Sequence, residues 1–143
     1  MKIKLNAWFQ CINGCSGRHP LNEIIYKCPQ CNELLEVQHD IDLLKQLGPD
    51  EWKALFNDRV GRHEWPYASS VWGKKEWVCP NLDNKNVVST LEGGTNLFWA
   101  ERLGSQLGLD DLWIKQCGMS HTGSFKDLGM TVLVSMVKQM ISE

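Results

Sequence analysis

The last third of the chain carries the clearest hydrophobic periodicity. Over residues 124–141, apolar side chains recur every three or four positions, and Phe125, Leu128, Val132 and Met136 share one face. This spacing predicts one long helix. Because the helix is so apolar, we expect it to lie buried between a sheet and another layer.

Two shorter patterns precede this helix. Residues 95–106 have helical spacing, and residues 112–115 have the composition of a short strand. A helix, a strand and a helix in this order predict the opening of a parallel, doubly wound α/β sheet. The fold class predicted for this part is therefore an open α/β domain.

The N-terminal half contains shorter predicted elements. Residues 23–27 and 34–37 are predicted to form two strands that flank a cysteine turn. Residues 40–47 and 49–60 are predicted to form two helices, the second of which begins with a proline and two acidic residues that suit a first turn. One face of the second helix carries Trp52, Leu55 and Phe56.

Four cysteines are grouped as two close pairs. Twelve residues separate the pair Cys11 and Cys15 from the pair Cys28 and Cys31. Two such pairs on turns are the ligand pattern of a structural zinc ribbon, and four thiolates complete a tetrahedral site without His19, which lies between them. The alternatives are four free thiols or disulfides, which a reducing cytosol disfavours.

These patterns divide the chain into three regions. Residues 1–39 form a zinc-ribbon-like segment, and residues 40–92 form a helical and irregular region. Residues 93–143 are the incomplete start of an α/β domain. Within the second region, residues 61–92 are rich in aromatic side chains without periodicity, which predicts a segment that wraps the surface and buries its rings. The alternative is a contact surface for a subunit or an effector.

A turn rich in glycine, serine and threonine leads from the predicted strand to Lys126 at the start of the long helix. A lysine there directs its amine toward the pocket at the strand end, and a partly desolvated amine is the nucleophile of a Schiff-base enzyme. The local pattern alone is more typical of a solvated surface lysine. Thr122 and Ser124 either meet an anion with their hydroxyl groups or cap the helix.

The composition argues against nucleic acid and anionic membranes as partners of the chain. The chain has 143 residues, of which 43% are apolar, and seven tryptophans, so it can build a core. Its 15 basic and 17 acidic residues give a net charge of −2, which offers no electrostatic case for nucleic acid or an anionic membrane. The N-terminus lacks the apolar core of a signal peptide, and no apolar run is long enough for a membrane span. We expect a soluble, cytoplasmic protein.

Longer motifs resemble one known family. The motifs at 65–78, 91–103, 111–115 and 121–130 are similar to threonine synthase of the plant and cyanobacterial type. The resemblance implies a fold-type-II enzyme that uses pyridoxal 5'-phosphate to convert O-phosphohomoserine and water to threonine and phosphate. It also implies that Lys126 carries the cofactor as a Schiff base and then moves protons on the substrate, and that the full-length protein is a homodimer.

The resemblance points to further site residues. Lys115, at the predicted strand end, is a candidate for the substrate phosphate, with a solvated or salt-bridged lysine as the alternative. Plant members of the family are activated by S-adenosylmethionine near a dimer interface. Pro66, Tyr67, Asn96 and Leu97 resemble parts of that region and are the effector candidates, although the sequence leaves open whether this chain kept the effector site.

The length raises a second interpretation. A fold-type-II enzyme has two α/β halves and needs on the order of 300 residues, and no glycine-rich loop follows Lys126 to hold the cofactor phosphate. We therefore expect an N-terminal portion of a threonine synthase that is inactive alone. The alternative is a non-catalytic zinc-ribbon module that binds or regulates another protein. The balance of basic and acidic residues in the ribbon argues against nucleic acid.

Overall fold

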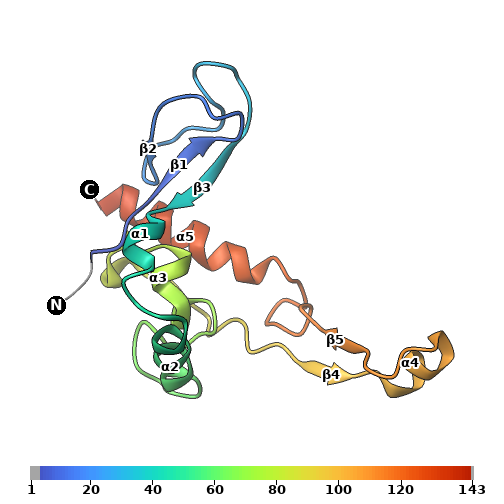
Figure 1. The fold of residues 1–143 in the computed structure, drawn as a ribbon. Helices are drawn as coiled ribbons and strands as arrows, with labels where there is room; N and C mark the ends of the chain where they lie inside the picture. The colour runs from blue at the N-terminus through green and yellow to red at the C-terminus, as the bar shows by residue number, and fades with distance from the viewer. Residues whose placement is uncertain (1–3, 143) are drawn as a thin grey trace.

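The fold consists of a body and an arm that projects from it (Figure 1). The computed structural model describes residues 4–142. The arm is residues 95–116, and the body is the rest. In the described part, the strands and α-helices are β1 (Ala7–Cys11), β2 (His19–Pro20), β3 (Leu35–His39), α1 (Ile41–Leu44), α2 (Pro49–Arg59), α3 (Lys75–Val78), β4 (Leu97–Trp99), α4 (Glu101–Leu107), β5 (Trp113–Lys115) and α5 (Asp127–Ser142). Two 3-10 helices lie at Trp72–Lys74 and Asn84–Asn86.

A three-stranded antiparallel sheet in the order β2-β1-β3 forms the N-terminal ribbon. β1 pairs with all of β3, from Ala7 opposite His39 to Cys11 opposite Leu35. The strand predicted at 34–37 is thus confirmed with a shift of one or two residues. The side chain of Asn81 fixes the sheet to the body, because it accepts a hydrogen bond from the Ala7 amide (3.0 Å) and donates one to the Ala7 carbonyl (3.1 Å).

The strand predicted at 23–27 is wrong, since this stretch has no regular structure. Ile24 and Tyr26 are 75% and 83% exposed there. Apolar side chains stabilise a strand by packing on one face of a sheet. In this stretch they cover nothing, so local composition does not lead to strand pairing.

Both helices predicted between 40 and 60 form. Asp40 caps α1 by accepting a hydrogen bond from the Leu43 amide (3.1 Å), but α1 ends at Leu44, three residues early. α2 runs over Pro49–Arg59, one residue shorter than predicted, and the Glu51 carboxylate accepts a hydrogen bond from the Gly48 amide (2.7 Å). Caps at both starts satisfy amide groups that a helix leaves unpaired.

An aromatic cluster holds α2 against α3. Trp52 and Phe56 share the predicted face of α2, with ring centroids 5.4 Å apart. The ring of Phe56 meets that of Trp77 edge-on at 4.8 Å, and the Trp52 indole donates to the Leu44 carbonyl (3.0 Å). The cluster therefore ties α1, α2 and α3 into one unit.

The core of the body lies between the ribbon, the segment after α2 and α5. Its buried residues are Ala7, Leu21, Trp72, Cys79, Leu82 and Val87, and Val132 and Met136 of α5 pack against them. Trp72 is fully buried, whereas Trp65 and Trp77 are about half exposed. The prediction that residues 61–92 wrap the surface and bury aromatic rings is thus confirmed for Trp72 only.

Two hydroxyl groups, rather than a purely apolar stripe, form the innermost contact of α5. Thr131 accepts a hydrogen bond from the Trp72 indole (2.8 Å) and donates one to the Val88 carbonyl (2.6 Å). Ser135, fully buried, accepts one from the Val88 amide (2.8 Å). These bonds fasten the segment before the arm to α5.

The predicted burial of α5 on all sides is wrong in this structure. The helix itself extends over nearly the predicted range, yet a broad apolar face is 42% to 80% exposed, formed by Met130, Leu133, Val134, Val137 and Ile141. In the described part of the chain, no second layer covers this face. A large exposed apolar surface of this kind marks an interaction site or a liability for aggregation.

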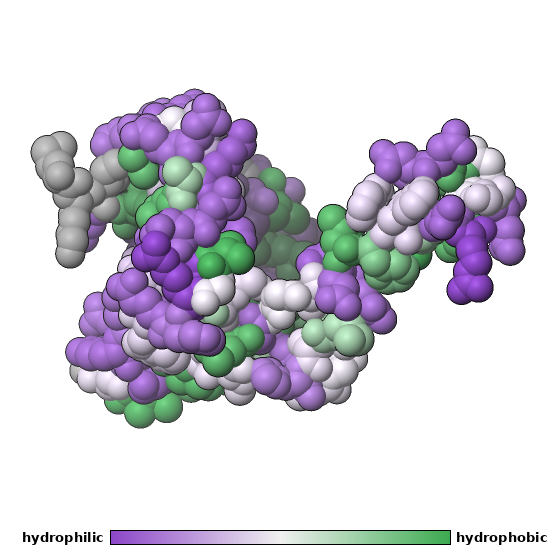
Figure 2. Space-filling view, turned by 90° about the horizontal axis from the view of Figure 1, so that it is seen from below, coloured by the Kyte–Doolittle hydropathy of each residue, from purple (hydrophilic) through white to green (hydrophobic). Residues whose placement is uncertain are grey.

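The arm differs most from the prediction. The first residues of the stretch 95–106 form strand β4 instead of a helix, and β4 pairs antiparallel with β5, so the expected parallel sheet is wrong here. α4 and a short turn at Gly108, where φ is +71°, connect the two strands. Next to the paired strands, the Ala100 amide donates to the Leu112 carbonyl (2.8 Å), which brings the chain back antiparallel to itself. Figure 2 shows the arm standing away from the body, with hydrophobic surface where it departs.

The described part is a small α/β structure with two small sheets and five α-helices. Among residues 4–142, no helix is long and apolar enough to cross a membrane.

Candidate functional site

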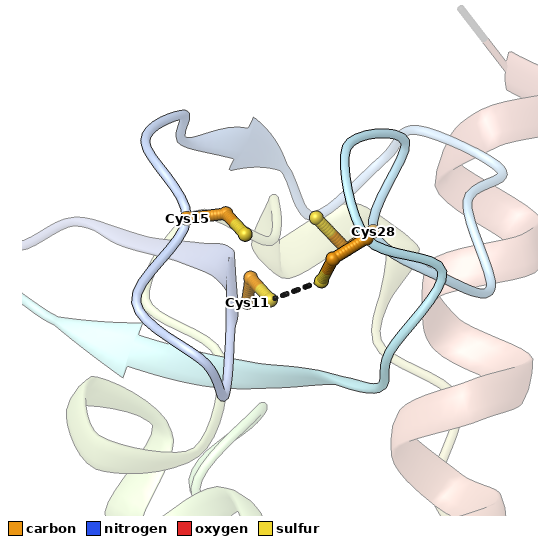
Figure 3. Close-up of side chains that lie close together, drawn as sticks. Cys11, Cys15 and Cys28 are labelled. Atoms are coloured by element: carbon orange, nitrogen blue, oxygen red, sulfur yellow. Dashed lines mark hydrogen bonds between the residues drawn. The ribbon is translucent and has the colours of Figure 1, made fainter.

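The four predicted cysteine ligands converge at one end of the ribbon. Cys11 ends β1, and a turn through Gly14, with φ +74°, brings Cys15 back toward it. Cys28 and Cys31 lie on a facing turn that the Asn32 amide closes by donating to the Cys28 carbonyl (2.8 Å). Figure 3 shows the side chains of Cys11, Cys15 and Cys28 pointing toward one another.

The sulfur positions suit a tetrahedral metal ion. All four Sγ atoms lie within 4.8 Å of one another, and those of Cys11 and Cys31 are 3.4 Å apart. Zinc–sulfur bonds of about 2.3 Å in a tetrahedron separate sulfur atoms by about 3.8 Å. Over the described residues, this is the one group of ligand-type side chains with such geometry, and His19 lies outside it, with Nδ1 3.6 Å from a Glu23 carboxylate oxygen.

The thiols differ in how readily they lose a proton. Backbone N–H groups of Cys31 and Gln30 that point at the Cys28 sulfur lower the pKa of Cys28 to about 7. Hydrogen bonds with the Cys31 and Cys11 thiols raise the pKa of Cys15 to about 12. A metal ion binds the thiolate form and would release the protons that the crowded thiols otherwise share.

Lys126 is placed immediately before α5, as predicted. Its carbonyl accepts hydrogen bonds from the Gly129 and Met130 amides (3.0 and 2.9 Å), and its amide donates to the Ser124 hydroxyl (3.2 Å). The side chain is exposed, so the expected partial desolvation of its amine is wrong in this structure. No hydrogen bond or ion pair of that amine occurs within residues 4–142.

Asp127 organises the turn that carries Lys126. Its carboxylate accepts hydrogen bonds from the Ser120 hydroxyl (2.5 Å), the Thr122 amide (2.9 Å) and the Thr122 hydroxyl (2.6 Å). The Thr122 hydroxyl is therefore engaged within the turn, and the Ser124 hydroxyl caps Lys126. All three bonds of the Asp127 carboxylate are thus local to this turn. The roles of Thr122 and Ser124 toward an anion stay predictions.

These three bonds give Asp127 a marked pH dependence. They lower the pKa of Asp127 from 3.8 to about 2, with the Ser120 hydroxyl as the largest cause. Because the pKa of Asp127 is lower in the folded chain, its bonds stabilise the fold fully above the ordinary pKa, and this stabilisation is lost as the pH falls toward 2.

We expect the NMR signal of the Thr122 amide to shift with pH, with a midpoint near 2, as the Asp127 carboxylate takes up a proton. In Asp127→Asn the midpoint should vanish and hydrogen exchange at Thr122 should be faster at pH 7. Asp58→Asn on α2 is the control, and equal exchange in both variants would contradict the assignment.

A cavity of about 460 Å³ lies beside this turn, between residues 91–93 and 118–123. His121 bridges the two segments through a hydrogen bond with the Thr90 carbonyl. Glu92 is 1% exposed, and one of its carboxylate oxygens accepts hydrogen bonds from the Ser89 hydroxyl (2.9 Å) and the Thr90 amide (3.0 Å). Its other oxygen has no partner in the described part of the chain.

Glu92 is a residue that the sequence reasoning missed. The sequence signal that could have identified it is an acidic residue directly before two glycines. Glycines without side chains let the backbone of this turn approach a neighbouring segment closely. A Cβ at Gly93 would lie 1.7 Å from the Ser70 hydroxyl oxygen. The same hydroxyl accepts a hydrogen bond from the Gly94 amide (2.8 Å). The turn at 91–94 is thus held tightly under the cavity.

The remaining predicted residues do not border the cavity of about 460 Å³. The Lys115 amine, at the end of β5, donates to the Thr95 carbonyl. Pro66 is buried in the body, and the Tyr67 ring lies 3.8 Å from the Arg59 guanidinium. Asn96 and Leu97 belong to the arm, and Leu97 is 60% exposed.

One of the effector candidates, Tyr67, lines a cavity of the body. Tyr67 borders a cavity of about 190 Å³ together with Gly93 and Gly94, whereas neither Asn96 nor Leu97 belongs to its lining. This cavity therefore contains no second effector candidate.

The sequence is similar to those of known threonine synthases. No protein-family model matches the chain. The chain is 55% identical over 123 residues to Threonine synthase 2, chloroplastic, of Arabidopsis thaliana, which is 85% of this chain and 24% of that protein. It is 35% identical over 131 residues to the threonine synthase of Methanocaldococcus jannaschii (92% and 29%) and 36% identical over 126 residues to that of Methanosarcina acetivorans (88% and 27%). The chain spans about a quarter of the length of these relatives.

Proposed function

The chain is a homologue of the threonine synthases, and from that premise we propose that it supplies the part of such an enzyme that holds pyridoxal 5'-phosphate on Lys126. The observation that carries the proposal is the 55% identity over 123 residues with the Arabidopsis relative. That match covers 85% of the chain, and the motif around Lys126 is the one expected of a cofactor lysine. The substrate proposed is O-phosphohomoserine, with threonine and phosphate as products.

The arrangement around Lys126 supports this role. Its amine is free of partners within residues 4–142 and projects from a turn that three hydrogen bonds to Asp127 keep in one conformation. Such preorganisation favours attack by an amine at a fixed position. When bound, pyridoxal phosphate supplies an electron sink for the substrate carbanion. Lys126 would hold it and, once released, would move protons between substrate carbons.

The cavity beside the turn is the proposed location of the reacting groups. Glu92 and His121 border it from two segments, and the backbone turn at 91–94 closes one side. Lys115 is the proposed contact for the substrate phosphate, although its amine here binds the Thr95 carbonyl and would have to release it. A lysine amine is a suitable partner because it presents a point charge to a phosphate.

We assign a structural zinc ion to Cys11, Cys15, Cys28 and Cys31. Four sulfur ligands make a closed tetrahedral site, with no open position for a substrate. The site lies at the far end of the ribbon from Asn81, which joins the ribbon to the core. Its proposed role is therefore to hold the ribbon strands together rather than to take part in the reaction.

The exposed surfaces support the proposal that catalysis needs more polypeptide than these residues. The apolar face of α5 and the arm are uncovered, and Phe125, next to Lys126, is 64% exposed. The relatives are more than three times as long as the chain. On this proposal, the homodimer, the effector S-adenosylmethionine and the cytoplasmic location belong to the complete enzyme.

A hybrid enzyme tests the function directly. This chain would replace the matching segment of the Arabidopsis relative, which shares 55% of its residues. We expect the hybrid to bind pyridoxal phosphate, to show a visible absorbance band, and to release phosphate from O-phosphohomoserine. Reduction with borohydride followed by peptide mass spectrometry should place the cofactor on Lys126. A folded hybrid that carries the cofactor on another lysine would overturn the assignment.

A further inference from the structure

A larger cavity, of about 820 Å³, lies elsewhere on the body. It is bordered by residues 4–6 before β1, by Asp40 and Leu43 at α1, by Lys75 of α3 and by residues 80–84 of the turn after α3. None of these residues belongs to the cavity between residues 91–93 and 118–123. A volume of this size is within the range of sites for small molecules. The proposed function gives this cavity no role.

One wall of the cavity carries a buried positive charge. Lys75 is only 9% exposed, and its amine meets the Pro80 carbonyl at 3.4 Å. Within residues 4–142, no carboxylate lies within ion-pair distance of this amine. Desolvation by burial lowers the pKa of Lys75. Removing a charged lysine from water costs free energy unless an anion or several hydrogen-bond acceptors surround its amine.

The acidic groups near Lys75 are engaged elsewhere. Glu76 forms two bonds of 2.7 Å with the Arg59 guanidinium. Asp40 caps α1 through the Leu43 amide (3.1 Å), and Asp83 lies 3.6 Å from the Lys85 amine. Glu76 and Asp83 are near enough to oppose the lowering of the Lys75 pKa, yet in the described part of the chain neither forms an ion pair with its amine.

We propose that this cavity binds a small organic oxyanion, whose carboxylate or phosphate group pairs with the Lys75 ammonium. The side chain of Asn84 is exposed on the rim, where its amide can donate to the same anion. Leu5, Leu43 and Leu82 provide an apolar wall for the carbon skeleton of the ligand. Sites for small molecules combine apolar walls with a few polar or charged groups that orient the ligand. Here Lys75 is the buried cation of the lining, and Lys4 adds a second, exposed one.

Titration with inorganic phosphate and, separately, with malonate tests the proposal on the zinc-loaded chain at constant ionic strength. Amide signals of residues 81–84 should shift and saturate in NMR spectra. Because phosphate also stabilises folded proteins in general, the decisive comparison is between variants. Lys75→Met should weaken binding at least tenfold, since it removes the charge and keeps the length of the side chain. Lys74→Met, at the exposed neighbouring lysine outside the cavity, should leave the affinity unchanged.

A second variant guards against misfolding of Lys75→Met. Asn84→Asp adds a negative charge at the rim and should weaken binding severalfold in a chain whose core is untouched. Saturation by phosphate alone would assign the site to phosphate esters, and saturation by malonate alone would assign it to carboxylates. The proposal is overturned if neither anion saturates by about 50 mM, a weak-binding limit, or if Lys75→Met binds as well as the unmodified chain.

Discussion

Lys126→Ala in the hybrid enzyme is expected to lower the rate of phosphate release by about 10³-fold or more. The proposed role of the amine is double, because it holds the cofactor and later moves protons, and alanine can do neither. The visible absorbance band of the bound cofactor should disappear together with the activity. Stability should change little, since the side chain is exposed and has no partner in the described residues.

Two comparisons separate a chemical loss from a structural one. Lys53→Ala removes an exposed lysine of α2 that pairs with Asp50 at 3.3 Å, and it should keep both the absorbance band and the rate. Added methylamine should restore part of the activity of Lys126→Ala, because a free amine can replace the missing proton carrier. Full activity in Lys126→Ala would show that another group holds the cofactor, and the proposed function would lose its central residue.

Local signals predicted the elements whose cause lies within a few residues. The cysteine spacing predicted the cluster, because each pair of ligands lies on a single short turn whose residues are close in sequence. The acidic first turn predicted α2, and a cap at Asp40 fixed the start of α1. The packing of Trp52 on Phe56 likewise follows from helical spacing along one face.

Elements that depend on a distant partner were predicted poorly. The period of α5 was clear, but its inner face is set by Thr131 and Ser135, whose partners Trp72 and Val88 are more than forty residues away. The arm is the second example. Leu97 to Trp99 have helical spacing with the following residues, yet β5 offers them a strand edge. Tertiary pairing overrides local preference in such cases. Glu92 was not predicted as a site residue for the same reason. Its burial depends on segments that are distant in sequence, such as the one that carries Ser70.

Removal of zinc is expected to unfold the N-terminal ribbon and to destabilise the rest of the body. A strand pair and a two-residue β2 bury little surface without a crosslink, and structural zinc commonly provides most of the folding free energy of such ribbons. The ribbon also contributes Ala7 and Leu21 to the core around Trp72. Loss of the metal should therefore lower the midpoint of thermal unfolding by about 10 °C or more, as followed by the fluorescence of the buried tryptophans.

Cys28→Ser is the sharpest variant for this prediction, with Cys117→Ser as its control. Both replace one sulfur by oxygen, but Cys28 belongs to the cluster, whereas Cys117 is a half-buried free thiol in the turn after β5. We expect Cys28→Ser to reduce the zinc content well below one ion per chain and to reproduce the loss of stability caused by a chelator. Cys117→Ser should keep one ion and the original midpoint. If the purified chain holds no zinc and a chelator leaves its unfolding midpoint unchanged, the four cysteines are free thiols and the ribbon is stabilised by its packing on Asn81 and the core alone.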